Sequence, residues 1–291
     1  MLKTMEPIFP KRLELELASS CNLRCVYCPR RHLSPLSGFM EPELFKKIIN
    51  EAAHYPDTVI VLHRRGESLL HPKFIDFLNL IAGKFKEVQI ATNATLLTEE
   101  KFRAITDAIT FISFSLDAPD AYNNTRVPAK YEDVEGKILR FLEFNNKIAG
   151  GKVRTQASMV KTEHTPVENV AAFKEIWKDR VNRIRVYEEH SKDGVFGAIK
   201  TPRNQRRPCV MPSYEMLIYD DGNVGRCNHD WNGNPLGDIK TNTITQIWTN
   251  AAYKGLRAQH ERLEISDPVC KNCDSWYPEM GTQGTGEVIE K

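Results

Sequence analysis

Cys21-Asn-Leu-Arg-Cys25-Val-Tyr-Cys28 is the stretch around which the chain is organised. Its three cysteines lie at offsets 0, 4 and 7, directly after a run of alternating leucine and glutamate. Three thiolates on one short loop can hold one face of an iron–sulfur cube, because such clusters need thiolate ligands. Four irons need four ligands, so this loop leaves one iron open for chemistry. A zinc site is the alternative, but the nearest fourth ligand, His32, lies at a spacing that differs from zinc fingers.

Length and charge narrow the class of protein. The chain has 291 residues, of which 41% are hydrophobic and 27% charged, and a net charge of +2, which is typical of a soluble globular protein. The low net charge disfavours a nucleic-acid partner. No run approaches the length of a membrane span and no signal segment is visible, so we expect a cytoplasmic protein without a membrane partner. In a reducing compartment, seven cysteines predict metal ligands before disulfides.

Strands and helices alternate from residue 13 to about residue 188. The predicted strands cover residues 13–18, 58–62, 87–92, 110–116, 152–160 and 181–187, and the predicted helices cover residues 41–54, 74–85, 98–108, 131–148 and 166–179. Six such units predict an α/β fold, a partial (β/α)6 TIM barrel with helices outside a parallel sheet. Because the cysteine loop follows the first strand, it lies at the carboxyl edge, where barrels place their sites.

A different pattern begins after a turn-rich segment, residues 189–208. There the sequence predicts a β-hairpin around Asp220-Asp-Gly222 and then an amphipathic helix. The predicted hairpin strands, helix and final loop cover residues 214–219, 223–226, 243–260 and 267–273. The expected domains are residues 11–200 and 201–280, followed by a flexible tail over residues 281–291.

Four further cysteines lie in this second part: Cys209, Cys227, Cys270 and Cys273. Four thiolates from a hairpin and a CxxC loop can form a closed tetrahedral site. The cysteines alone do not separate a structural zinc from an iron–sulfur cluster. Three cysteines in the first set and four in the second account for all seven, so no thiol is left over.

The chain resembles the radical S-adenosylmethionine (SAM) superfamily, in which CxxxCxxC with an aromatic residue before the last cysteine follows a first strand. The second cysteine set, with Gly222 five residues before Cys227 and CxxC further on, resembles the shortened SPASM/twitch extension of that superfamily. The resemblance implies SAM and two [4Fe-4S] clusters. One cluster would bind SAM on Cys21, Cys25 and Cys28, and an auxiliary cluster would occupy a small β-hairpin-plus-helix domain on Cys209, Cys227, Cys270 and Cys273.

The resemblance also implies which side chains contact SAM. Gly66 and Glu67 follow the second strand where the family usually has Gly-Gly-Glu, whose atoms receive the SAM amino group, although Arg65 replaces the first glycine here. Glycine lets backbone approach a ligand, and a carboxylate offsets an ammonium. The other implied contacts are an aromatic residue near the adenine and polar residues at strand ends: Tyr27, Asn93, Ser115, Asp117, Arg126 and Arg185. Turn formation, helix capping and loop packing are the structural alternatives.

The family chemistry implies a 5′-deoxyadenosyl radical that abstracts a hydrogen atom from the substrate, with the auxiliary cluster accepting an electron. The leading prediction is a radical SAM oxidoreductase that oxidises an alcohol of a sugar or aminocyclitol, with a flavodoxin- or ferredoxin-type reductant. The alternatives are a maturase of a ribosomal peptide, a radical epimerase with a non-cysteine hydrogen donor, and a zinc-stabilised nucleic-acid-binding module. About a dozen residues precede the first strand, which disfavours the maturase. No catalytic side chain is predicted.

Overall fold

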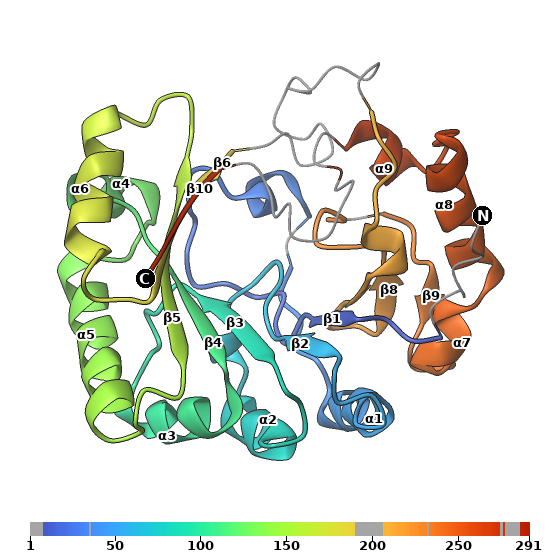
Figure 1. Cartoon of the computed structure of the whole chain (residues 1–291), viewed down its shortest axis with the longest axis horizontal. Coiled ribbons are helices and arrows are strands. Elements are labelled where there is room, and N and C mark those ends of the chain that lie inside the picture. Colours follow the sequence, from blue (N-terminus) through green and yellow to red (C-terminus); the bar gives the residue numbers. More distant parts are fainter. Residues whose placement is uncertain (1–7, 35, 190–205, 232, 274–275, 277–285) are drawn as a thin grey trace.

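Six parallel strands, neighbours in sequence order, form the centre of an open sheet (Figure 1). They are β1 (Arg12–Leu15), β2 (Val59–Val61), β3 (Val88–Thr92), β4 (Phe111–Ser115), β5 (Arg154–Lys161) and β6 (Arg183–Glu188). This computed structural model describes residues 8–34, 36–189, 206–231, 233–273, 276 and 286–291. The arrangement confirms the predicted α/β fold with a partial, unclosed barrel.

Helices cover one face of this sheet (Figure 1). They are α1 (Pro42–Ala52), α2 (Phe74–Ile81), α3 (Glu99–Ala108), α4 (Pro119–Thr125), α5 (Tyr131–Lys147) and α6 (Val167–Trp177). The apolar members of the alternating strands face them: Leu13 and Leu15 are fully buried, and Phe114 of β4 packs edge-on against Phe141 of α5. Within the described ranges, no helix has both the length and the apolar character needed to span a bilayer.

The opposite face of the sheet is polar. Parallel pairing sets Ser113 beside Gln156 and Ser158 beside Arg185, and residues in register point to the same side. Gln156, Ser158 and Arg185 are almost fully buried, so their polar groups line an interior rather than open solvent. Alternation within β6 alone does not show which way Arg185 points. The register shows that Arg185 lies on the interior face, beside the ends of β4 and β5.

The C-terminal part continues the same sheet. Strand β7 (Glu215–Ile218) pairs parallel with β1, and it forms the predicted hairpin with β8 (Asn223–Gly225), which in turn pairs with β9 (Gly237–Asp238). Three helices follow: α7 (Ile244–Trp248), α8 (Ala251–Arg262) and α9 (Pro268–Asn272). The predicted single helix is two, because the Asn250 side chain caps α8 by accepting the Tyr253 N–H. The predicted loop contains α9, capped by Asp267.

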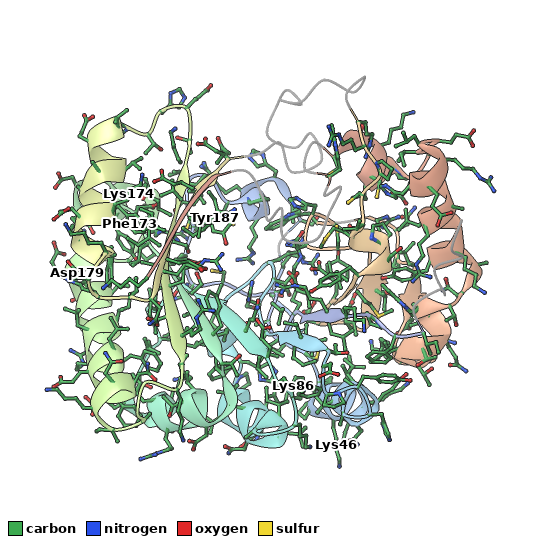
Figure 2. All side chains as sticks on the ribbon, in the orientation of Figure 1. Lys46, Lys86, Phe173, Lys174, Asp179 and Tyr187 are labelled. Carbon is green, nitrogen blue, oxygen red and sulfur yellow. The ribbon has the colours of Figure 1, made fainter. Side chains whose placement is uncertain are left out.

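The predicted flexible tail was wrong over its last residues. Residues Gly286–Glu290 form β10, which pairs antiparallel with the edge strand β6. The edge of a sheet offers unpaired backbone groups, and an extended Glu-Val-Ile-Glu segment can satisfy them. Ion pairs add to the contact: Lys174 of α6 meets Glu287, and Asp179 meets Lys291 (Figure 2). Residues 281–285 and 190–205, which include part of the tail and the predicted junction, lie outside the described residues.

Candidate functional site

The three N-terminal cysteines lie on the loop that follows β1, half-buried. Two backbone hydrogen bonds hold the loop: Arg24 N–H donates to Val127 O at 2.8 Å, and Val26 N–H donates to Thr125 O at 2.9 Å. Burial raises the pKa of the Cys25 thiol to about 11. This thiol therefore keeps its proton until a metal displaces it, as expected where the donors of a metal site are thiols.

Gly66 packs against the start of the cysteine loop. A Cβ at this position would lie 2.2 Å from the carbonyl oxygens of both Ala18 and Ser20, and the next residue, Glu67, donates its N–H to Ser20 O at 2.8 Å. Only glycine leaves room for this contact. The predicted SAM turn and the cysteine loop thus touch through backbone atoms.

The Glu67 carboxylate is buried and already bound by protein donors. Oε1 accepts hydrogen bonds from Leu69 N–H and Thr92 Oγ1, and Oε2 accepts one from Asn93 N–H at 2.7 Å. Burial raises the pKa of Glu67, and these three donors counteract the rise. Asn93 also reaches the cysteine loop, with Nδ2 at 4.0 Å from Cys21 Sγ. Glu67 and Asn93 therefore fix the end of β3 beside the first cysteine.

Asp117, directly after β4, joins three predicted SAM contacts into one group. Its Oδ2 accepts hydrogen bonds from Tyr27 Oη at 2.7 Å, Thr125 Oγ1 at 2.6 Å and Arg126 Nε at 3.0 Å. The Arg126 guanidinium lies over the Tyr27 ring, 5.4 Å from its centroid. Burial opposes the charge on Arg126, but Asp117 outweighs it and holds the pKa of Arg126 above its ordinary value. The group orients Tyr27 between the second and third cysteines.

A cavity of about 410 Å³ opens beside this group, lined by Tyr27, Asp117 and Ala118 on one side and by Met159 and Thr162 among others on the far side. This is the size of a small-molecule site. The second Asp117 oxygen, Oδ1, is buried and has no hydrogen-bond partner. A buried acceptor left without a donor is unfavourable, so a ligand hydroxyl or amine in this cavity would satisfy it.

Ser115 and Arg185 lie apart from both groups, on the polar interior face. Ser115 pairs in register with Ser158, which pairs with Arg185. The Arg185 guanidinium lies over the Tyr187 ring, 4.9 Å from its centroid. The structure therefore places six of the eight predicted SAM contacts against the cysteine loop and these two further along the interior.

The four C-terminal cysteines line one second cavity. Cys209, Cys227, Cys270 and Cys273 line one pocket, whose free volume is about 20 Å³. Within the described part of the chain, no three metal-binding side chains approach closely enough to hold a single ion. Burial raises the pKa of the Cys227 and Cys270 thiols above the ordinary value. Four thiol donors that line one pocket fit an iron–sulfur cluster by their chemistry.

A buried arginine joins the hairpin to the CxxC loop. Arg226, next to Cys227, donates to both carboxylate oxygens of Asp267 at 2.8 Å and forms an ion pair with Asp230 at 2.8 Å. Asp267 in turn accepts the Cys270 N–H. Burial disfavours the charge on Arg226, but the two carboxylates outweigh it and raise its pKa. Two of the four cysteines are thus held in place through one guanidinium.

Sequence reasoning missed the contact between the two sites. Arg65 donates to Glu16 Oε1 at 2.8 Å and forms an ion pair with Oε2 at 2.6 Å, and its guanidinium lies 4.1 Å from the Tyr219 ring centroid. Arg64 lies over the Trp231 ring at 4.7 Å. We call Glu16, Arg64, Arg65, Tyr219 and Trp231 the joint. One feature of the sequence could have indicated this contact. The alternation of leucine and glutamate before the cysteines puts Glu16 on the same face of the strand as the site.

Family comparison agrees with this geometry. Residues 15–162 match the radical SAM superfamily, and residues 209–274 match SPASM, an iron–sulfur cluster-binding domain. The chain belongs to the radical SAM superfamily. Its cofactors are therefore SAM and [4Fe-4S] clusters, and the match at residues 209–274 favours an auxiliary iron–sulfur cluster over structural zinc. Cys21, Cys25 and Cys28 lie within the matched residues 15–162.

Two curated relatives match different lengths of the chain. A tungsten-containing aldehyde ferredoxin oxidoreductase cofactor-modifying protein of Pyrococcus furiosus is 35% identical over 157 residues, which are 53% of this chain and 44% of that protein. The chain thus spans less than half the length of that relative. An S-adenosyl-L-methionine-dependent 2-deoxy-scyllo-inosamine dehydrogenase of Niallia circulans is 23% identical over 283 residues, which are 93% of this chain and 95% of that protein.

Two solved structures share the fold. BtrN in complex with AdoMet and 2-DOIA has a TM-score of 0.62 at 19% identity, covering 94% of this chain and 99% of BtrN. Streptococcus suis SuiB bound to the precursor peptide SuiA has a TM-score of 0.70 at 12% identity, covering 94% of this chain and 76% of SuiB. At these identities the likeness concerns the fold, and it agrees with an α/β fold whose parallel barrel is not closed.

Proposed function

We propose that this radical SAM enzyme is an oxidoreductase that oxidises an alcohol of a small polyhydroxylated molecule, a sugar or an aminocyclitol. The four-cysteine cavity carries the proposal, because four protein thiolates leave no auxiliary iron open to substrate. A fully ligated cluster is suited to receive an electron. The match to an inosamine dehydrogenase over almost the whole of both chains supports the same reaction class.

The proposed reaction balances as a two-electron oxidation. When bound, the first cluster and SAM supply a 5′-deoxyadenosyl radical, with the electron for SAM cleavage coming from a flavodoxin- or ferredoxin-type reductant. The carbon-bound hydrogen atom of the substrate alcohol ends in 5′-deoxyadenosine. Cys209, Cys227, Cys270 and Cys273 would hold the auxiliary cluster, which would accept one electron. The hydroxyl proton would then leave to solvent, and the carbon–oxygen single bond would become a carbonyl.

We assign SAM to the surface formed by the cysteine loop and the strand ends beside it. Gly66 and Glu67 would face the amino group, with Asn93 fixing the same edge, and Tyr27 would pack beside the adenine. Support comes from their contacts: all four lie against the cysteine loop, and Asp117 has a buried oxygen that lacks a donor next to the 410 Å³ cavity. The rigid hydrogen bonds of Asp117 keep Arg126 and Tyr27 oriented, so binding requires little reordering.

The polar interior face supplies groups for a hydroxylated substrate. Gln156 Nε2 donates to Ser113 Oγ at 2.8 Å, and Ser113 Oγ donates to Ser158 Oγ at 3.1 Å. Gln156 Oε1 is buried and has no hydrogen-bond partner. A substrate hydroxyl or ammonium would provide the missing donor, and both groups occur on an aminocyclitol. Ser115 and Arg185 flank this row and would contact substrate or SAM ribose.

The two rival reactions draw on different observations. The fold likeness to SuiB permits a peptide substrate, but at 12% identity it concerns the fold alone. A radical epimerase would return the hydrogen atom from a donor side chain, and all seven cysteines are accounted for as cluster ligands, so its donor would not be a thiol. An oxidation needs an electron acceptor, and a fully ligated auxiliary cluster would serve as one. Neither rival reaction depends on such an acceptor as directly.

The experiment is anaerobic turnover of the reconstituted chain with dithionite, SAM and a panel of aminocyclitols, sugars and peptides in deuterated water. The proposal expects 5′-deoxyadenosine and a carbonyl product in equal amounts. Deuterium incorporated into a recovered alcohol would identify an epimerase instead, and turnover of peptides alone would identify a maturase. Either result would reject alcohol oxidation.

Cysteine variants separate the roles of the two sites. Cys25→Ala is expected to abolish 5′-deoxyadenosine formation, because it removes a ligand of the SAM-binding cluster. Cys270→Ala/Cys273→Ala is expected to spare SAM cleavage but to block the carbonyl product. If the second variant still makes oxidised product, the electron-acceptor role is wrong.

A further inference from the structure

His260 lies in the wall of the four-cysteine cavity with its ring orientation fixed. It is on α8, only 4% exposed, and its Nδ1 accepts the N–H of Cys209 at 3.3 Å. Because Nδ1 uses its lone pair as an acceptor, the ring is uncharged and its proton is on Nε2.

The Nε2–H of this ring is a buried donor without a protein partner. Buried polar groups in folded proteins are nearly always paired, so a lone donor calls for an acceptor that the polypeptide does not provide. His260 lines the same space as Cys209, Cys227, Cys270 and Cys273, and that space is where the auxiliary cluster fits. Cluster sulfides and thiolates are anionic acceptors.

We propose that His260 donates a hydrogen bond from Nε2 to a sulfur of the auxiliary cluster and raises the reduction potential of that cluster. A hydrogen bond to a cluster sulfur stabilises the reduced, more negative state more than the oxidised one, and such bonds are among the factors that set cluster potentials. His260 is thus a positioning and tuning residue rather than a cluster ligand. The inference rests on the auxiliary cluster and on none of the substrate chemistry proposed above.

The consequence is directional. A higher auxiliary potential makes transfer of an electron into this cluster more favourable, whichever radical provides it. The His260 ring would use both of its nitrogens at this site. Nδ1 accepts the backbone N–H of Cys209, and Nε2 would donate to the cluster. A single side chain therefore orients one ligand and donates to the cluster.

The test measures the auxiliary cluster alone. A full-length chain with Cys21→Ala/Cys25→Ala/Cys28→Ala holds only the second cluster, and its midpoint potential is followed by anaerobic EPR titration without SAM or substrate. His260→Leu, which has no donor, is expected to lower the equilibrium constant for reduction about tenfold, a shift of about 59 mV to more negative potential for one electron. His260→Gln keeps an N–H donor and is expected to recover most of the shift.

The control is His54→Leu, which removes an exposed histidine that does not line the four-cysteine cavity and is expected to leave the potential unchanged. The proposal is overturned if His260→Leu keeps its full iron content and its equilibrium constant for reduction lies within about twofold of the parent value. The parent itself gives a second measurement. Pulsed EPR with 15N-histidine should show a histidine nitrogen coupled to the reduced cluster, and this coupling should persist in His229→Gln, which replaces the other histidine that lines the cavity. If no histidine nitrogen couples to the reduced cluster, the hydrogen bond does not exist, even where His260→Leu loses its iron.

Discussion

The joint between the two sites gives a prediction about stability. Arg65 stands where the radical SAM family usually has glycine, and in this chain its guanidinium is bound to Glu16, to the backbone oxygen of Trp231 at 3.1 Å and to the face of Tyr219. Arg65→Ala removes all of these contacts. It also leaves the Glu16 carboxylate, which is fully buried, without its cation.

The magnitude follows from that buried carboxylate. Removing one partner of a buried ion pair destabilises a protein by about 3–5 kcal/mol, because the remaining charge is neither solvated nor paired. Asp220, whose Oδ1 lies 3.7 Å from Arg65, adds to the effect. Burial and the nearby Glu16 raise the pKa of Asp220 to about 6 although Arg65 opposes the rise, so loss of the arginine raises this pKa further. A carboxyl with a raised folded-state pKa loses stability as pH rises toward that pKa, so the loss in Arg65→Ala should be largest well above pH 6 and should shrink as pH falls toward about 6.

The assay is anaerobic urea unfolding of the cluster-loaded chain, followed by tryptophan fluorescence, for which Trp231 in the joint is a local probe. With a slope of about 3 kcal/mol per molar urea, a loss of 3 kcal/mol lowers the midpoint by about 1 M. Lys86→Ala is the matched control (Figure 2). Both side chains of the Lys86–Asp57 ion pair are exposed, so its loss should not measurably change the urea midpoint.

A double variant tests the cause. Arg65→Ala/Glu16→Gln replaces the stranded carboxylate with a neutral amide and should recover a large part of the lost stability. Arg65→Lys keeps the charge without the planar fork and should fall between the parent and Arg65→Ala. An Arg65→Ala midpoint equal to that of Lys86→Ala, or a double variant no more stable than the single one, would refute the reasoning.

Three further variants probe other contacts. Gly66→Ala places a Cβ 2.2 Å from two carbonyl oxygens and should lower 5′-deoxyadenosine formation more than tenfold; unchanged turnover would contradict the backbone contact. Asp117→Asn should weaken SAM binding about tenfold in equilibrium dialysis, and equal affinity would exclude Asp117 from the site. Burial beside Glu215 raises the pKa of Glu14, so the fold loses stability as pH rises above the ordinary value of 4.5. Glu14→Gln should flatten that decline in urea midpoints measured between about pH 5 and about pH 8, and an unchanged slope would be evidence against it.

The sequence predicted what depends on local order. Cys21, Cys25 and Cys28 lie within eight residues after a strand with clear alternation, so both the strand and the position of the loop at its carboxyl end could be derived. Sheet register completed the prediction for Arg185, because its side cannot be known from β6 alone but follows from its pairing with Ser158.

The remaining contacts depend on residues far apart in the chain. Glu16 and Arg65 are 49 positions apart, and each alone is typical of a solvated charge. The glycine at position 66 is visible in the sequence, but nothing in the sequence indicates that it contacts Ala18 and Ser20. The edge strand β10 was missed for a related reason, since its few residues are exposed and acquire a strand only from the free edge of β6.

The sheet joins the two predicted domains. The sequence predicts a partial barrel followed by a small C-terminal domain, and β7 of that second part pairs in parallel with β1 along its whole length, with Leu15 beside Ile218. Parallel neighbours end at the same edge, so the turn at Tyr219 and Asp220 lies beside the residues that lead into Cys21. Ser19 Oγ accordingly donates to Asp220 Oδ2 at 2.8 Å. The hairpin that leads to Cys227 thus starts from the same sheet edge as the loop with Cys21, Cys25 and Cys28, and strand pairing rather than a linker sets the relation between the two cysteine sets.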